Sequence, residues 1–154
     1  MSAPAAVAAE ERLLTFEVAG SLYALPIACV VEVAEASALA CIPMLPLELA
    51  GVLNFHGDAL PVMRRETLLD LDAQELPEPS HVLVLAPRPN GGAKLGLCAD
   101  RIEGLVVGDG ARSVGAGPVA ERRSIDGRLV FVLDAERLVA RAAEAIEASL
   151  EWSE

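Results

Sequence analysis

The sequence predicts an all-β domain that is completed by one C-terminal helix. Short apolar segments recur along its 154 residues, and turns rich in glycine, proline and aspartate separate them. After residue 134 the pattern changes, because Leu138, Ala142, Ile146 and Leu150 recur four residues apart along one helical face. A chain of this length normally folds as one domain around its own core.

The N-terminal region predicts a loose tail followed by a β-hairpin. Residues 1–11 lack the basic start and long apolar core of a signal peptide, so we expect a flexible tail there. Apolar and polar side chains partly alternate over residues 13–18. Gly20 and Ser21 then turn the chain into the apolar residues 22–33, which form the second arm.

Proline and glycine divide the next part of the chain into short elements. Pro43 and Pro46 exclude a regular strand ladder between them, because proline lacks the backbone N–H. The predicted elements that follow are a helical turn at 48–50, strands at 51–55 and 59–63 around a Gly57-Asp58 turn, and a helical turn at 66–71.

The second half predicts further short strands and then the helix. The strands are expected at 81–86, 94–99, 102–107 and 128–133. Four glycines between residues 108 and 117 predict a loop there rather than an element. Asp134 is placed to cap a helix over residues 135–151.

Two parts of the sequence resemble two others at similar spacing. Residues 57–62 match 127–132, 70 residues later, and Ala24 with Val30 matches Gly96 with Ile102, 72 residues later. A chain rich in valine and leucine also matches itself by chance, which is the alternative. A duplication predicts two similar β-units, at about 12–70 and about 80–134, closed over a shared core.

Composition and charge exclude several classes of function. A net charge of −11 is unfavourable for binding nucleic acid or anionic membranes, and it suits a basic or mixed-charge protein partner. No apolar run approaches the length of a membrane span, so we expect no direct membrane insertion. Three cysteines without CxxC spacing indicate neither a disulfide framework nor a zinc site, and they fit a reducing cytoplasm.

Several turns and strands of the first half follow one another in a specific order. They are Leu14-Thr15-Phe16, Tyr23-Ala24-Leu25-Pro26-Ile27, Ile42-Pro43 with Pro46, Gly51-Val52-Leu53-Asn54-Phe55-His56-Gly57, and Leu60-Pro61-Val62. This order and spacing resemble the CheW family of chemotaxis coupling proteins, and the second half is similar but less specific. The resemblance covers nearly the whole chain.

The resemblance implies a CheW-like domain over residues 12–151, built from two intertwined five-stranded SH3-like β-barrels. It also implies a cytoplasmic adaptor without catalytic site, cofactor or metal, which binds the regulatory domain of a CheA-type histidine kinase and the cytoplasmic tip of a chemoreceptor. The matching kinase-binding positions are Val30, Glu32 and Gly51, and the receptor-binding positions are His56, Val82, Gly96 and Ile102. The plain alternative is that Val30 belongs to the core and Glu32 is simply solvated.

The sequence departs from the family pattern at three places, one of which is a short connection from Gly108 to Asp126. His56 stands where the family has arginine, so the bidentate guanidinium fork is missing. Arg64-Arg65-Glu66 stands where the family usually has Asp-Leu-Arg. These departures favour, as the alternative function, a divergent regulator that binds a kinase or itself without receptor contact.

A third hypothesis uses the few reactive side chains of the second half. Cys98, Asp100 and His81 could serve a small-molecule-binding or catalytic β-barrel. Cys98 lies within an apolar strand, however, where cysteine usually behaves as a small buried hydrophobe. Neither histidine has a second ligand at metal-binding spacing.

Overall fold

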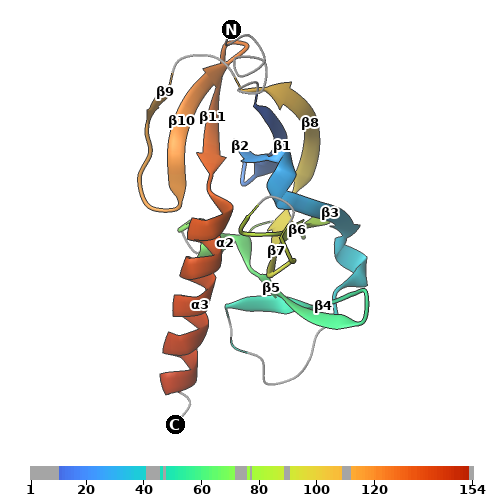
Figure 1. The fold of residues 1–154 in the computed structure, drawn as a ribbon. Helices are drawn as coiled ribbons and strands as arrows, with labels where there is room; N and C mark the ends of the chain where they lie inside the picture. Colours follow the sequence, from blue (N-terminus) through green and yellow to red (C-terminus); the bar gives the residue numbers. More distant parts are fainter. Residues whose placement is uncertain are drawn as a thin grey trace, which may run out of the picture.

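The structure is a computed structural model that describes residues 11–40, 46, 48–71, 76, 78–88, 91–108 and 112–152, with side chains described up to residue 148. Its strands form two sheets, and α3 (Ala135–Trp152) leaves the upper sheet and runs down beside the lower one (Figure 1). The predicted all-β fold with a C-terminal helix is confirmed. Neither of the described α-helices is both long and apolar enough to cross a bilayer.

The upper sheet has six strands and the lower sheet has five. The upper sheet runs in the order β8 (Arg101–Val107), β1 (Arg12–Val18), β2 (Ser21–Pro26), β11 (Arg128–Leu133), β10 (Val119–Ile125) and β9 (Arg112–Val114). The lower sheet runs in the order β3 (Val30–Glu35), β6 (His81–Leu85), β7 (Leu95–Ala99), β5 (Asp58–Met63) and β4 (Leu49–Phe55). Within the described residues, three short helices connect strands: η1 (Ile27–Cys29), η2 (Ala36–Ala38) and α2 (Arg65–Leu68).

The strand registers repeat as the internal duplication predicts. Each sheet has one parallel pairing, in which Val62 of β5 lies opposite Gly96 of β7 and Val132 of β11 lies opposite Ala24 of β2. The bulge that β4 carries after Leu49 recurs in β10 after Val119, 70 residues later. A shared register with shared bulges is far harder to obtain by chance than a match of apolar letters.

Each sheet takes strands from both halves of the chain. The upper sheet combines β1 and β2 with β8 to β11, and the lower sheet combines β3 to β5 with β6 and β7. The chain crosses between the sheets where Pro26 and η1 interrupt the apolar run 22–33, because proline cannot continue the ladder. The sheets therefore do not coincide with the contiguous segments 12–70 and 80–134 that the sequence suggested.

Three apolar clusters correspond to the two sheet interiors and the space between them. Leu13, Ala24, Ile125, Val130 and Val132 fill the curve of the upper sheet. Leu53, Leu60, Val62, Val82, Val84 and Cys98 fill that of the lower sheet. The largest cluster joins residues of both sheets, including Phe16, Leu25, Leu83 and Leu97, to Ala135, Leu138 and Ala142 of α3. The predicted helical stripe thus covers the joint between the sheets.

Two local predictions are wrong. Residues 48–50 form no helical turn, because β4 already begins at Leu49. The predicted loop at 108–117 contains β9, and β10 follows it at Val119. The apolar pattern of β10 was hidden because Arg123 occupies a core position there with only 3% of its surface exposed.

The two ends of the domain bear on the predicted N-terminal tail and on the predicted cap of the C-terminal helix. Residues 1–10 lie outside the described residues, but Glu11 is fixed, since its backbone carbonyl accepts from the N–H of Gly108 and its carboxylate contacts Arg123. Glu11 therefore belongs to the folded domain. At the other end of the chain Asp134 caps α3, because its Oδ1 accepts from the N–H of Glu136 at 2.9 Å.

Gly96 gives a test of the packing inside the lower sheet. A Cβ at this position would lie 2.7 Å from Cγ2 of Val62 and 2.9 Å from Cγ1 of Val82. We expect Gly96→Ala to lower the free energy of unfolding by roughly 1–3 kcal/mol, as other overpacked cores do. Urea denaturation measures this change. Gly92→Ala is the matched control, because a Cβ there meets nothing within 4 Å; equal stability of both variants would contradict the packing argument.

Candidate docking site

One edge of the lower sheet exposes apolar side chains next to acidic ones. Among named strands β3 pairs only with β6, so its other side is an edge. Ile27, Val31 and Val33 are among the few large apolar side chains that remain exposed, and Glu32 is exposed between the two valines. An apolar strip with a charged residue at its rim has the character of a protein-docking surface.

The predicted kinase-binding residues lie on or beside this edge. Val30 is half-buried and packs against the main core. Its side chain therefore supports the edge strand from inside and is only partly accessible to a partner. Gly51 is buried beneath the edge, where a Cβ would lie 2.8 Å from the carbonyl oxygen of Ala40. Ala40 pairs with Val52 through two backbone hydrogen bonds of 2.8 and 3.0 Å, which bring β4 next to the segment that follows β3.

His56 lies at a tight turn that meets this edge. His56 and Gly57 both have positive φ, 50° and 91°, as a two-residue hairpin turn requires. The N–H of Gly57 donates to Oδ1 of Asn54 at 3.0 Å, and the imidazole packs edge-on against Phe55. Nε2 of His56 lies 3.9 Å from Oε1 of Glu32. The structure thus brings together a predicted receptor-binding residue and a predicted kinase-binding residue.

The other predicted receptor-binding residues are not on the surface in the same way. Val82 and Gly96 are buried inside the lower sheet, and Ile102 is half-buried against the main core. A partner cannot touch the side chain of Val82 in this conformation. Any influence of Val82 or Gly96 on a partner would therefore act through the shape of the sheet.

A buried ion pair joins the two sheets near the start of α2. Nε of Arg65 lies 2.9 Å from Oδ1 of Asp100, and the two side chains are only 5% and 14% exposed. Oδ2 of Asp100 accepts from the N–H of Ala19 at 2.8 Å, and its own N–H donates to the carbonyl of Glu17. Asp100 follows β7 of the lower sheet and precedes β8 of the upper one, so it fixes the crossing between them.

The adjacent residues Arg122 and Arg123 differ in burial, as Arg64 and Arg65 do. Arg123 is buried and contacts Glu121 and Glu11, and it donates to the carbonyl of Gly108 at 2.7 Å. Arg122 and Arg64, in contrast, are exposed. Arg65 and Arg123 thus each serve the fold through a buried ion pair.

The strand register separates the residues of the catalytic hypothesis. Cys98 lies opposite Val82, and facing residues of antiparallel strands point to the same side. His81 precedes Val82, so its side chain points to the opposite face of the sheet from Cys98. Asp100 is engaged by Arg65 and Ala19. No Cys-His pair is therefore formed, and within the described part of the chain no cluster could hold a metal ion.

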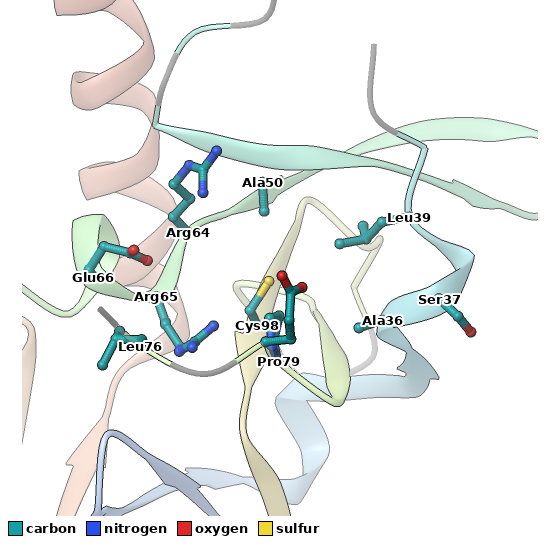
Figure 2. Close-up of a pocket in the computed structure, with 11 residues that line it drawn as sticks. Ala36, Ser37, Leu39, Ala50, Arg64, Arg65, Glu66, Leu76, Pro79 and Cys98 are labelled. Atoms are coloured by element: carbon teal, nitrogen blue, oxygen red, sulfur yellow. The ribbon is translucent and has the colours of Figure 1, made fainter. Parts of the chain in front are cut away.

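Cys98 instead lines a cavity of about 450 Å³ at the side of the lower sheet. Figure 2 shows its thiol between Ala36 and Leu39 on one side and Arg64 to Glu66 on the other. Burial raises the pKa of the Cys98 thiol to about 11, which outweighs the opposing effect of Arg65. A thiol of this kind is a poor nucleophile at neutral pH.

Sequence reasoning placed the docking edge only through the resemblance, and it missed the exposed Val31 and Val33. The Val31-Glu32-Val33 alternation is the signal that could have found them. It indicates a strand with a polar and an apolar face, but the apolar face would normally be assigned to the core. Arg65 and Asp100 were noticed singly, and no pattern in the sequence pairs them.

Comparison with known proteins gives the following results. The model of the CheW-like domain family matches residues 12–143. Among solved structures, the scaffolding protein TtCheW from Thermoanaerobacter tengcongensis matches with a TM-score of 0.69 and 19% sequence identity, over 84% of this chain and 92% of that one. The fold of two SH3-like barrel subdomains is therefore shared. None of the curated proteins matches the chain.

Removal of the carboxylate at position 100 tests the joint between the sheets. We expect Asp100→Asn to lower the free energy of unfolding by roughly 3 kcal/mol, because it removes the carboxylate that lies 2.9 Å from the buried Arg65 guanidinium. Chemical denaturation measures the effect. Arg88→Gln removes the exposed Arg88 to Glu136 contact and is the control, with an expected loss below about 1 kcal/mol. Similar losses in both variants would mean that the buried pair contributes no more to stability than an exposed pair.

Thiol labelling tests the environment of Cys98. Iodoacetamide at about pH 8 should label Cys98 slowly in the folded protein and readily in denaturant, as measured by peptide mass spectrometry. The pKa is raised above its ordinary value of 9.0, so burial of the neutral thiol stabilises the fold below pH 9. That contribution declines as the pH rises toward 11. Rapid labelling of the folded protein would contradict the buried position.

Proposed function

The chain belongs to the CheW-like domain family, and from this we propose that it is a non-enzymatic adaptor in chemosensory signal transduction. It would act in the cytoplasm and couple chemoreceptors to a CheA-type histidine kinase by binding both. The family membership supports the adaptor role, and the fold is that of a structural relative described as a scaffolding protein. The two named partners are our proposal.

The observation that carries the kinase half of this proposal is the exposed edge of β3. Val31 and Val33 retain 46% and 41% of their surface, although the other valines and leucines of the lower-sheet strands are buried or half-buried. Burial of two valines contributes a few kcal/mol to an association. Glu32, which points to the other face of the same edge strand from Val33, adds charge complementarity to a basic partner. We assign Val30, Glu32 and Gly51 to the kinase-binding side, with Val30 and Gly51 shaping the edge from beneath.

The receptor-binding part of the proposal rests on the turn at His56 and on the three residues Val82, Gly96 and Ile102. His56 is 75% exposed and lies where a partner can reach it. Val82, Gly96 and Ile102 would set the shape of a receptor groove rather than contact the receptor through exposed side chains.

A second candidate function keeps the kinase and omits the receptor. His56 has no guanidinium fork, and its ring lies 3.9 Å from Glu32 of the kinase-binding edge. A histidine in this position favours a divergent regulator that binds a kinase, or itself, without receptor contact.

Two substitutions on the edge test the kinase-binding assignment. We expect Val33→Asp and Glu32→Arg each to weaken binding to the regulatory domain of the host's CheA-type kinase by about tenfold or more, because they remove an apolar anchor and reverse a rim charge. Isothermal titration calorimetry measures the affinities. Leu129→Asp changes a more exposed apolar residue, on the upper sheet, and serves as the control. Unchanged affinity of both edge variants, with the fold intact, would rule out this edge.

A further inference from the structure

Asp100 is the single residue between β7 of the lower sheet and β8 of the upper sheet. Its carboxylate makes one contact toward each sheet. Oδ1 lies 2.9 Å from Nε of Arg65 on α2, which follows β5 of the lower sheet, and Oδ2 accepts from the N–H of Ala19 in the upper sheet at 2.8 Å. The backbone N–H of Asp100 also donates to the carbonyl oxygen of Glu17 on β1 at 2.9 Å. One residue thus ties the two sheets together.

Both partners of the Asp100 carboxylate are themselves held in place. Ala19 has a φ of 51° in the tight turn between β1 and β2. Arg65 begins α2, in which the side chain of Leu68 is buried in the main core. The carbonyl oxygen of Leu68 accepts from Nε of Arg141 on α3 at 3.3 Å. A rotation of one sheet against the other would therefore disrupt the contacts of Asp100.

The ion pair differs in kind from the apolar contact between the sheets. The hydrophobic effect is non-directional, so it favours contact more than one particular angle. A buried ion pair often adds little stability compared with apolar residues, and its best attested use is to select one arrangement. In the other repeat unit the corresponding positions are Ala135 and Ala28, so a unit of this fold forms without such a pair. Arg65 and Asp100 are thus suited to set the angle at which the sheets meet.

The residues assigned to receptor binding lie on both sides of Asp100. Gly96 precedes it on β7, and Ile102 follows it on β8. The proposed receptor-binding site therefore takes residues from both sheets, whereas all the residues assigned to kinase binding belong to the lower sheet. A change in the angle between the sheets would alter the first site and leave the second one intact.

We propose that Asp100 and Arg65 are positioning residues, which set the angle between the two sheets and thereby the shape of the receptor-binding site. Neither side chain has to touch the receptor for this. Without the ion pair the apolar core still holds the sheets together, but Ile102 on one sheet moves relative to Val82 and Gly96 on the other. The receptor part of this inference rests on the proposed function, and the angle does not.

Residual dipolar couplings of the backbone N–H groups test the angle, because they report the orientation of each sheet. In the wild-type protein one alignment tensor should describe both sheets. In Asp100→Asn, each sheet should fit its own structure but the two sheets should require different orientations. The double variant Arg65→Leu with Asp100→Asn should behave in the same way, and it keeps the test available if the single variant does not fold, because it removes both charges of the pair.

Calorimetric titration tests the consequence for binding. Both variants should bind a soluble fragment of the host's chemoreceptor that contains the cytoplasmic tip about fivefold more weakly than wild type, while their affinity for the regulatory domain of the CheA-type kinase stays within about twofold. A general loss of folded protein would lower both affinities, so the difference between the two partners separates positioning from stability. Arg88→Gln removes the exposed contact with Glu136 and is the control, with wild-type couplings and affinities.

The outcomes separate this inference from the function on which it rests. An unchanged orientation of the sheets in both variants would overturn the inference, whatever the affinities. A changed orientation with wild-type receptor affinity would overturn it as well, because the receptor-binding site would then not depend on the angle. If the wild-type protein, with a verified fold, binds no receptor fragment, the receptor-binding part of the proposed function fails and the inference fails with it. The dipolar couplings keep these failures distinguishable, because they require no receptor.

Discussion

The apolar contact between the two sheets is the constraint on which the rest of the structure depends. Each sheet takes strands from both halves of the chain, so neither sheet can form before the chain has crossed between them. Phe16, Leu25, Leu83 and Leu97 come from four strands in two sheets, and they share one core with Leu138 of α3. Burial of this joint stabilises both sheets at once. It also fixes the position of one sheet, and of its edge strands, relative to the other sheet.

Much of the fold was predictable because its local signals agree with its tertiary structure. Short apolar segments between turn residues became strands, and the apolar stripe after Asp134 became α3. β10 failed as a prediction for a physical reason, since Arg123 replaces an apolar side chain in the core and depends on Glu121 and Glu11 for its counter-charge. Burial of a paired charge leaves no trace in hydrophobic periodicity.

The candidate site was less predictable, because it depends on contacts between distant segments. The resemblance indicated Val30 and Glu32, but only the folded chain places Glu32 beside His56 and leaves Val33 exposed at a strand edge. The burial of Val82 and Gly96 was equally invisible, because an apolar strand reads alike whether it lines a groove or fills a core. Sequence spacing locates residues on strands, and strand pairing decides which of them meet.

The duplication explains why the docking surface belongs to one unit alone. Shifting by the repeat distances takes Glu32 to Gly104 and His56 to Asp126, so the second unit keeps the bulge and the left-handed turn but has no acid and imidazole pair. The buried pair is similarly one-sided, since Arg65 corresponds to Ala135 and Asp100 to Ala28. The backbone of the two units has therefore remained alike while their charges have diverged.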